Sequence, residues 1–466
     1  MWQMLIKVKY MRKSVFSIAV AFVCFCLLCF LCCPAAAVQP KISLDRLNDS
    51  QPHWSITMDE DANITLDGGN IFGAINPPAD CDVYIYSNGA NTISQWANGT
   101  QINCSTSPHL AIEAAIVALP SGGSLSLRNS ITVTDDIDIT ESNIHFNGNG
   151  YTITAGAGCT DAVFSVDSVG INESINGFWL TCCTVLCSDI AAHAVEFTGH
   201  YVTIPNGFHR IVSVSASNAT SSTFKFNTTI EAYLYDVSSW YSDASGILFD
   251  EACMNIWVTK YTSQYNTYGL QIGGNNPAPN HRCEGIFVTD SLMFGDLTAV
   301  YIRGVLYADI SHCILDYSTG NVVYVEGDSD SIAITESWMS GSAQTEAYNC
   351  INLNPTSATV SNVVFSHNNI GDAGYCGIKA SYVDGLIVTE NTIFNNARID
   401  TGGVDVMQGA CTNSIISNND LKTTAGNYAI YSGWASNGTI FTENHYADAI
   451  YIADVLNVTQ HNMARV

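Results

Sequence analysis

The sequence predicts an all-β protein built as a parallel β-helix solenoid. Three observations support this prediction. A short phrase recurs nine times at steps of 17 to 31 residues, a second strand-like phrase follows most copies, and no helical pattern separates the copies. A unit of about 24 residues has no core of its own, so such units stack as successive turns of one solenoid.

The chain starts with a basic and then apolar leader. Four basic residues (7, 9, 12 and 13) precede the apolar run 15–33, and alanines follow at 35–37. This order is typical of a secretory signal peptide cleaved before Val38, and a run of this length can also stay as an N-terminal membrane anchor. Residues 1–37 are therefore predicted to export the protein to the cell surface or the medium.

The next segments are an N-terminal extension, 38–103, and the β-helix domain, 104–466. The domain opens with a short capping helix at about 107–119. Ser107 is suited to the N-cap and Pro108 to the first helical position, and the apolar residues Leu110, Ala114 and Leu119 are expected to face the solenoid.

The recurring phrase has a fixed internal pattern. Each copy has an apolar residue followed by Ser or Thr, and in seven copies a large apolar residue stands five positions after the first. The first positions are Val258, Val288, Ile310, Ile334, Phe365, Val388, Ile416, Phe441 and Val458. The later apolar residues are Met293, Leu315, Met339, Ile370, Ile393, Leu421 and Met463. Equivalent residues are expected to stack in columns.

The second phrases, such as AVYIRG from Ala299 and VVYVEG from Val322, alternate like half-buried strands. Gly, Asn and Asp between the phrases are turn formers. In four copies of the first phrase, Asn stands three places after the first position: Asn368, Asn391, Asn419 and Asn444. These amides can bond to one another up the stack, or can serve only as turn residues that tolerate left-handed backbone.

The opening of the domain resembles a known superfamily. The segment YIYSNG, a helix ending in ALPSGG, a pair of strands and GNG are similar to the start of the pectate-lyase-like right-handed parallel β-helix superfamily. The resemblance covers about residue 82 to the C-terminus. It implies a right-handed parallel β-helix with a helix over its open end, and it leaves the function open because this fold carries many functions.

Cysteine usage agrees with export. Five of the seventeen cysteines lie in the leader, which leaves an even number, twelve, for an oxidising compartment. Cys253 and Cys283 both stand five residues before the first position of their rung, so they are predicted to share a column and form a disulfide. Further predicted pairs are Cys350–Cys376 and Cys81–Cys104.

Nine N-x-S/T triplets predict N-glycosylation on exposed turns. They begin at Asn48, Asn63, Asn98, Asn103, Asn172, Asn218, Asn227, Asn437 and Asn457. Removing the leader leaves 12 basic against 42 acidic residues, a net charge of −30. Such a charge repels nucleic acid, so no nucleic-acid partner is expected.

Three functions are compatible with these features. The first is an exported β-helix protein that binds a polysaccharide or surface glycan. The second is a diverged polysaccharide lyase or glycoside hydrolase, although the family's usual catalytic motifs are absent from the sequence. The third is a structural or spike-like envelope component. No cofactor is predicted firmly, and Ca²⁺ is the one ion that the many carboxylates suggest.

One column is the predicted site. The residue after each Ser/Thr alternates between acid and histidine in the middle rungs, which suggests acid–base or ligand groups at Glu336 and Glu390 with His312 and His367 as partners. Asp290 and Glu443 would extend the column as substrate-binding residues. The alternative is a solvated face that alternates charge to avoid stacking like charges. The final rung, with no capping helix after it, further predicts that this end is covered by a partner chain, a second subunit or a further domain.

Overall fold

The computed structural model describes residues 81–464 except 168–173, 200–205, 275–280, 342–345, 355–359, 401, 424–427, 434, 447–449 and 453–458, together with 41–44, 54–58 and 64–67. It contains two compact units, Met1–Ala79 and Asp80–Val466. In the first, β1 (Lys41–Leu44), β2 (Trp54–Met58) and β3 (Ile64–Asp67) form an antiparallel sheet. The predicted leader, 1–37, lies outside the described residues.

The second unit starts earlier than the predicted boundary at residue 104. Strand β4 (Val83–Asn88) pairs in parallel with β7 (Gly123–Leu127). On the other side of β4, β5 (Asn91–Trp96) pairs with it in antiparallel orientation, and β6 (Gln101–Ser105) pairs with β5 in the same way. Because this pairing continues the sheet of the solenoid, β4 to β6 belong to the β-helix unit and not to the extension.

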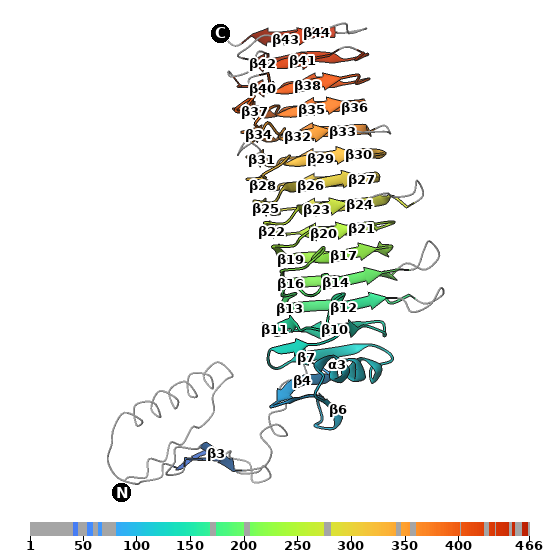
Figure 1. The fold of residues 1–466 in the computed structure, drawn as a ribbon, viewed down its shortest axis with the longest axis vertical. Coiled ribbons are helices and arrows are strands. Elements are labelled where there is room, and N and C mark those ends of the chain that lie inside the picture. Colours follow the sequence, from blue (N-terminus) through green and yellow to red (C-terminus); the bar gives the residue numbers. More distant parts are fainter. Residues whose placement is uncertain are drawn as a thin grey trace, which may run out of the picture. The chain divides into compact units, whose positions relative to one another are not determined.

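Helix α3 (Pro108–Val117) begins after Ser107, as predicted, and Figure 1 places it at the N-terminal end of the stack beside β7. Its buried face is one step away from the predicted one, because Leu110 is exposed while Ala111, Ile112, Ala115 and Ile116 are fully buried. In the part of the chain that the structure describes, no helix is long and apolar enough to cross a membrane.

The rungs form a right-handed parallel β-helix, with one turn above the next (Figure 1). Each turn adds one strand to a thirteen-strand parallel sheet. Its strands are β9 (Ile137–Asp138), β12 (Ala162–Asp167), β14 (His193–Thr198), β17 (Phe224–Asn227), β20 (Ser245–Phe249), β23 (Tyr268–Ile272), β26 (Thr298–Arg303), β29 (Val323–Glu326), β32 (Ile351–Leu353), β35 (Ile378–Ser381), β38 (Val406–Gly409), β41 (Ile430–Ser432) and β43 (Ile450–Ile452). These strands contain the second phrases of the sequence.

The first phrases form the two arms of a 28-strand sheet, which bends at a one-residue corner in each turn. The early turns contribute β8 (Ile131–Val133), β10 (Ile144–Asn147), β11 (Thr152–Ala155), β13 (Trp179–Leu186), β15 (Asn206–Gly207), β16 (Arg210–Ser217), β18 (Thr229–Ile230) and β19 (Tyr233–Trp240). The later first arm has β21 (Met254–Thr259), β24 (Cys283–Thr289), β27 (Val305–Ser311), β30 (Ser329–Thr335), β33 (Val360–Ser366), β36 (Val383–Thr389), β39 (Ile415–Ser417), β42 (Ile440–Tyr446) and β44 (Thr459–Ala464). The second arm has β22 (Thr262–Gln264), β25 (Leu292–Phe294), β28 (Ile314–Asp316), β31 (Trp338–Ser340), β34 (Asn369–Gly371), β37 (Thr392–Phe394) and β40 (Asp420–Leu421).

Eight copies of the phrase stack in the predicted register, from Val258 opposite Val288 up to Ile416 opposite Phe441. The ninth copy is shifted, because Phe441 pairs with Gln460 and not with Val458. The pairing also has an irregularity between Thr442 and His445, so that His445 lies opposite Met463. The predicted columns are therefore correct through the eighth copy.

The core is one continuous column of apolar side chains from both sheets. The predicted asparagine ladder runs along it, and all four asparagines are buried. Asn368 Nδ2 donates to Asn391 Oδ1 at 3.1 Å, Asn391 Nδ2 to Asn419 Oδ1 at 3.0 Å, and Asn419 Nδ2 to Asn444 Oδ1 at 2.9 Å. The amide oxygens of Asn391, Asn419 and Asn444 also accept from the backbone N–H of the preceding asparagine, so the ladder fastens four rungs together.

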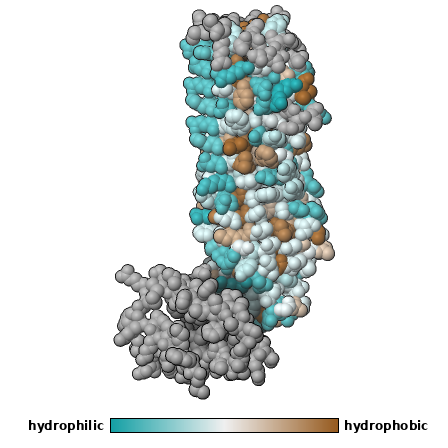
Figure 2. All heavy atoms as spheres, turned by 90° about the vertical axis from the view of Figure 1, so that its left-hand side faces the viewer, coloured by the Kyte–Doolittle hydropathy of each residue, from teal (hydrophilic) through white to brown (hydrophobic). Residues whose placement is uncertain are grey.

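Figure 2 shows the face on the side where Figure 1 places β25, β28 and β31. Hydrophilic residues run up one edge of this face, and apolar residues lie in scattered groups. Ile314 of β28 is one exposed apolar residue of these strands. Scattered apolar residues of this kind are normal on a soluble surface and mark no binding patch.

Candidate functional site

The predicted acid–histidine column lies at the corner between the two arms of the 28-strand sheet. Its members all have left-handed backbone, with φ between 51° and 58°. They are Lys260, Asp290, His312, Glu336, His367, Glu390, Asn418 and Glu443, and all are exposed. A single left-handed residue lets the chain turn sharply while the next side chain points into the core.

The corner column forms two ion pairs. His312 Nε2 contacts the carboxylate of Glu336 on the next rung, and His367 Nε2 contacts that of Glu390. Each of these side chains is about half exposed, so water and salt screen the pairs. Asp290 and Glu443 lie further along the same column, outside these two pairs. The structure thus brings the predicted partners together on a convex edge.

In the part of the chain that the structure describes, no disulfide joins any of the twelve cysteines. Cys253 stands directly opposite Cys283 on the next rung, because Met254 pairs with Glu284, and the two thiols lie within hydrogen-bond reach. Cys350 is opposite Gly377, one place away from Cys376, because Ile351 pairs with Ile378.

The structure does not bring Cys81 and Cys104 together. Cys104 pairs with Ile93, which pairs with Tyr86. Cys81 is five residues before Tyr86, or about 16 Å along the strand, and Cys104 lies two strands away. A disulfide needs Cα atoms closer than about 7 Å, so this predicted pair is incompatible with the sheet register.

In protein secreted and purified without reductant, we expect non-reducing peptide mapping to recover a peptide pair linked through Cys253 and Cys283. Facing positions on neighbouring parallel strands are about 4.8 Å apart, which suits a disulfide. Cys411 serves as the control, because it shares the column but faces Val383, and it should be recovered as an alkylated thiol. Free thiols at both 253 and 283 would contradict the prediction.

A second surface, absent from the sequence prediction, follows the outer face of the thirteen-strand sheet. On seven successive rungs the residues at one outward position stand directly above one another. We call this column the sheet-face stripe, and it consists of Tyr301, Tyr324, Asn352, Lys379, Met407, Tyr431 and Tyr451. Tyr301 is buried, with 6% of the residue exposed, so the accessible part of the stripe runs from Tyr324 to Tyr451. At about 4.8 Å per rung this part extends for about 24 Å.

The sheet-face stripe combines aromatic surface with hydrogen-bonding groups. The ring centroids of Tyr301 and Tyr324 are 5.7 Å apart, and those of Tyr431 and Tyr451 are 5.2 Å apart. The Tyr301 hydroxyl donates a hydrogen bond to the Glu326 carboxylate. Burial raises the pKa of Tyr301, and this hydrogen bond raises it further. The sequence carried a signal for the stripe, since Tyr stands in the middle of AVYIRG, VVYVEG and AIYIAD.

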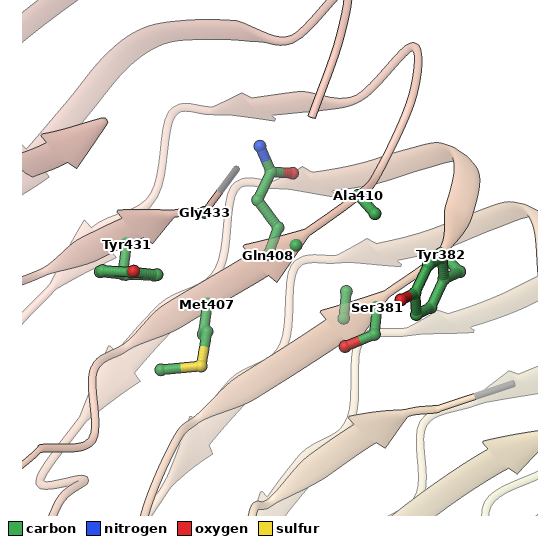
Figure 3. Close-up of a pocket in the computed structure, with 9 residues that line it drawn as sticks. Ser381, Tyr382, Met407, Gln408, Ala410, Tyr431 and Gly433 are labelled. Carbon is green, nitrogen blue, oxygen red and sulfur yellow. The ribbon is translucent and has the colours of Figure 1, made fainter. Parts of the chain in front are cut away.

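A small hollow of about 170 Å³ opens at the C-terminal part of the stripe. Figure 3 shows Met407 and Tyr431 on one side of it and Ser381 and Tyr382 on the other. Gly409 helps to keep the hollow open, because the position that a Cβ atom would take there has no other atom within 4 Å. The hollow therefore gives a ligand on the stripe a place for a protruding group.

The outer face of the 28-strand sheet carries a different aromatic column. Tyr233 and Trp257 stack at 4.7 Å with an interplanar angle of 7°, and Trp257 and Phe287 stack at 5.7 Å and 13°. The Arg210 guanidinium lies 4.5 Å over the Trp179 ring, beside a hollow of about 510 Å³. Stacked rings on neighbouring strands stabilise the sheet that carries them.

Comparisons with known proteins agree with this architecture. A family model described as "Right handed beta helix region" matches residues 298–460. Curated protein sequences give no match.

Several solved structures are similar. The A-module of mannuronan C-5 epimerase AlgE6 from Azotobacter vinelandii has 14% identity over 77% of this chain and 96% of that chain, with a TM-score of 0.47. A tailspike mutant of E. coli bacteriophage HK620, solved in complex with a hexasaccharide, has 12% identity over 77% and 68%, with a TM-score of 0.48. The Agl-KA catalytic domain has 10% identity over 76% and 66%, with a TM-score of 0.50. Identities this low concern the fold alone. The stacked parallel rungs and the family match over residues 298–460 identify the fold of the chain as a right-handed parallel β-helix.

Proposed function

We propose that this protein is exported and binds a polysaccharide along the sheet-face stripe. The observation that carries the proposal is the continuity of the stripe from Tyr324 to Tyr451, in which aromatic, amide and ammonium groups follow one another on a rigid sheet for about 24 Å. A sugar presents an apolar C–H face and a rim of hydroxyl groups, so it needs ring carbon and hydrogen-bonding groups side by side. A linear repeat on the protein suits a linear repeat in the ligand.

The net charge of the chain limits the class of polysaccharide that it can bind. The whole chain has a net charge of −26, which disfavours a polyphosphate ligand such as nucleic acid. Lys379 is the one charged member of the stripe, and its Nζ lies 5.9 Å over the Tyr375 ring. A neutral or sparsely charged polysaccharide therefore fits this face better than a dense polyanion.

Export, N-glycosylation and a membrane tether through the leader are parts of the same proposal. Five of the predicted glycosylation sites are described, and each is exposed or half-buried: Asn98, Asn103, Asn218, Asn227 and Asn437. Sites at such positions can carry a glycan without disturbing the core. The other four, Asn48, Asn63, Asn172 and Asn457, lie outside the residues whose side chains are described.

A glycan array followed by titration of the best ligand tests the binding site. Tyr324→Ala with Tyr431→Ala should weaken binding by about tenfold or more, since two ring contacts of about 1 kcal/mol each are lost. The matched comparison is Glu336→Ala with His367→Ala, which breaks both ion pairs of the corner column and should change stability by less than about 1 kcal/mol.

The pair of double variants separates the two surfaces. Lost binding in the tyrosine variant alone supports the stripe, whereas lost binding in the corner variant alone assigns the ligand, a sugar or Ca²⁺, to the corner column predicted from the sequence. A wild-type protein that binds no glycan on the array would contradict the proposed function.

A second candidate function is polysaccharide lyase or glycoside hydrolase activity, and the two His–Glu pairs favour it. A histidine held against a carboxylate on a rigid edge can move a proton. Incubation with the bound polysaccharide should then release unsaturated or reducing sugar, and Glu336→Ala with His367→Ala should stop the release. A structural role would instead show as concentration-dependent assembly, without sugar binding, in sedimentation velocity.

A further inference from the structure

One cluster of ligand-type side chains belongs to neither surface. Asp161, His193 and Glu196 lie on two neighbouring turns near the N-terminal end of the thirteen-strand sheet, and their ligand atoms lie within 4.8 Å of one another. The backbone holds the three in place, because Ala162 pairs with His193 and the His193 N–H donates to the Asp161 carbonyl at 2.9 Å. The group is thus positioned by the same register that builds the solenoid.

His193 is oriented as metal-binding histidines are. Its side chain is buried, with 5% of the residue exposed, and Nδ1 is 2.6 Å from the carbonyl oxygen of Ser222. That contact makes Nδ1 the protonated nitrogen and leaves the Nε2 lone pair without a hydrogen bond to any described residue. A ring nitrogen that donates to a carbonyl while the other carries a lone pair is the usual arrangement of a ligating histidine.

The two carboxylates complete the group. Glu196 is oriented by Lys225, whose Nζ is 2.8 Å from Oε1, so Oε2 is the oxygen that remains for a ligand. Asp161 is exposed and closes the cluster on the solvent side. The set therefore offers one neutral imidazole nitrogen and two carboxylate oxygens, with access from outside.

We propose that Asp161, His193 and Glu196 bind a divalent transition-metal ion of the kind that imidazole and carboxylate share, such as Zn²⁺. The imidazole ligand disfavours Ca²⁺ and Mg²⁺, which prefer oxygen alone. Three protein ligands leave a tetrahedral ion with one open position, here on the exposed side of the sheet. This site is independent of the polysaccharide site and is tested by a separate measurement.

The test is a competition titration of the chelator-treated full chain with Zn²⁺ and a chromophoric zinc chelator. We expect one Zn²⁺ site per chain that Asp161→Asn and Glu196→Gln each weaken by about tenfold or more. His193→Ala should weaken it further, and Asp161→Asn keeps the test valid if loss of the buried ring disturbs the fold. As a matched control, His281→Ala removes another histidine beside a carboxylate, Glu251 at 3.0 Å, and should leave the site unchanged.

Two outcomes would overturn the proposal. One is unchanged Zn²⁺ affinity in both Asp161→Asn and Glu196→Gln, which would place any bound zinc elsewhere, for example on the corner histidines. The other is an X-ray absorption spectrum at the zinc edge that shows sulfur neighbours, because sulfur ligands would assign the ion to cysteines. Nitrogen and oxygen ligands alone, with weaker binding in the two carboxylate variants, support the site.

Discussion

Replacing Asn391 with alanine is expected to lower the free energy of unfolding by about 4 kcal/mol, although the residue binds no ligand. The Asn391 amide oxygen accepts from the backbone N–H and from Nδ2 of Asn368, and its Nδ2 donates to the carbonyl of Phe365 and to Oδ1 of Asn419. Each of these partners is buried, so a lost bond leaves a polar group without water, at about 1–3 kcal/mol per group.

Urea denaturation, monitored by circular dichroism, measures this loss of unfolding free energy. The matched control is Asn369→Ala on the neighbouring rung, where the asparagine is exposed, and it should change the midpoint little. Hydrogen exchange of the four ladder rungs should also speed up in the Asn391 variant, because the broken ladder lets those turns open locally. Equal midpoints for the two variants would mean that the amide ladder contributes no stability.

Replacing Asp296 with asparagine is expected to stabilise the protein by up to about 4 kcal/mol at pH 8 and by almost nothing at pH 4. Asp296 is fully buried. Burial raises the pKa of its carboxyl from the ordinary 3.8 to about 7, against the opposing effect of the N–H and amide of Asn266, which donate to Oδ1 at 2.8 and 3.2 Å. The folded state therefore keeps the proton over a range where the unfolded chain has lost it.

The direction of the pH effect follows from that difference. Because the folded pKa of Asp296 is the higher one, its contribution is fully present below pH 4 and is lost as the pH rises through about 7. Other buried groups change the absolute curve, since burial lowers the pKa of His209 to about 3. The informative quantity is therefore the difference in unfolding free energy between wild type and Asp296→Asn, measured at several pH values.

Asp290→Asn is the control for this prediction, because Asp290 is exposed at a corner where asparagine also accepts a left-handed backbone. Its unfolding free energy should follow that of the wild type at every pH. A difference between wild type and Asp296→Asn that does not grow between pH 4 and pH 8 would show that the buried carboxyl stays protonated or becomes solvated.

The periodicity of the chain was sufficient to predict much of the fold. The apolar residue of the phrase, the large apolar residue five places on and the asparagine between them all proved to be columns, because each rung repeats the same bend and the same inward positions. The corner column was also predicted as a column, and its His–Glu pairs are formed. The prediction for the ninth copy is wrong because Phe441 lies opposite Gln460, two places after Val458, and nothing in the sequence of Val458 and Thr459 signals that shift.

Properties that depend on single-residue register or on unequal turn lengths were decided only by the tertiary structure. Cys350 and Cys376 differ from a facing pair by one place, and a shift of one place in a strand changes which side chains meet. The cluster joins Asp161 to His193 and Glu196, which lie 32 and 35 positions later, across a turn whose length matches no neighbouring step. A repeated pattern determines which residues lie in a column, because the backbone repeats. Which side chains meet across columns depends on loop lengths and packing, and these do not repeat.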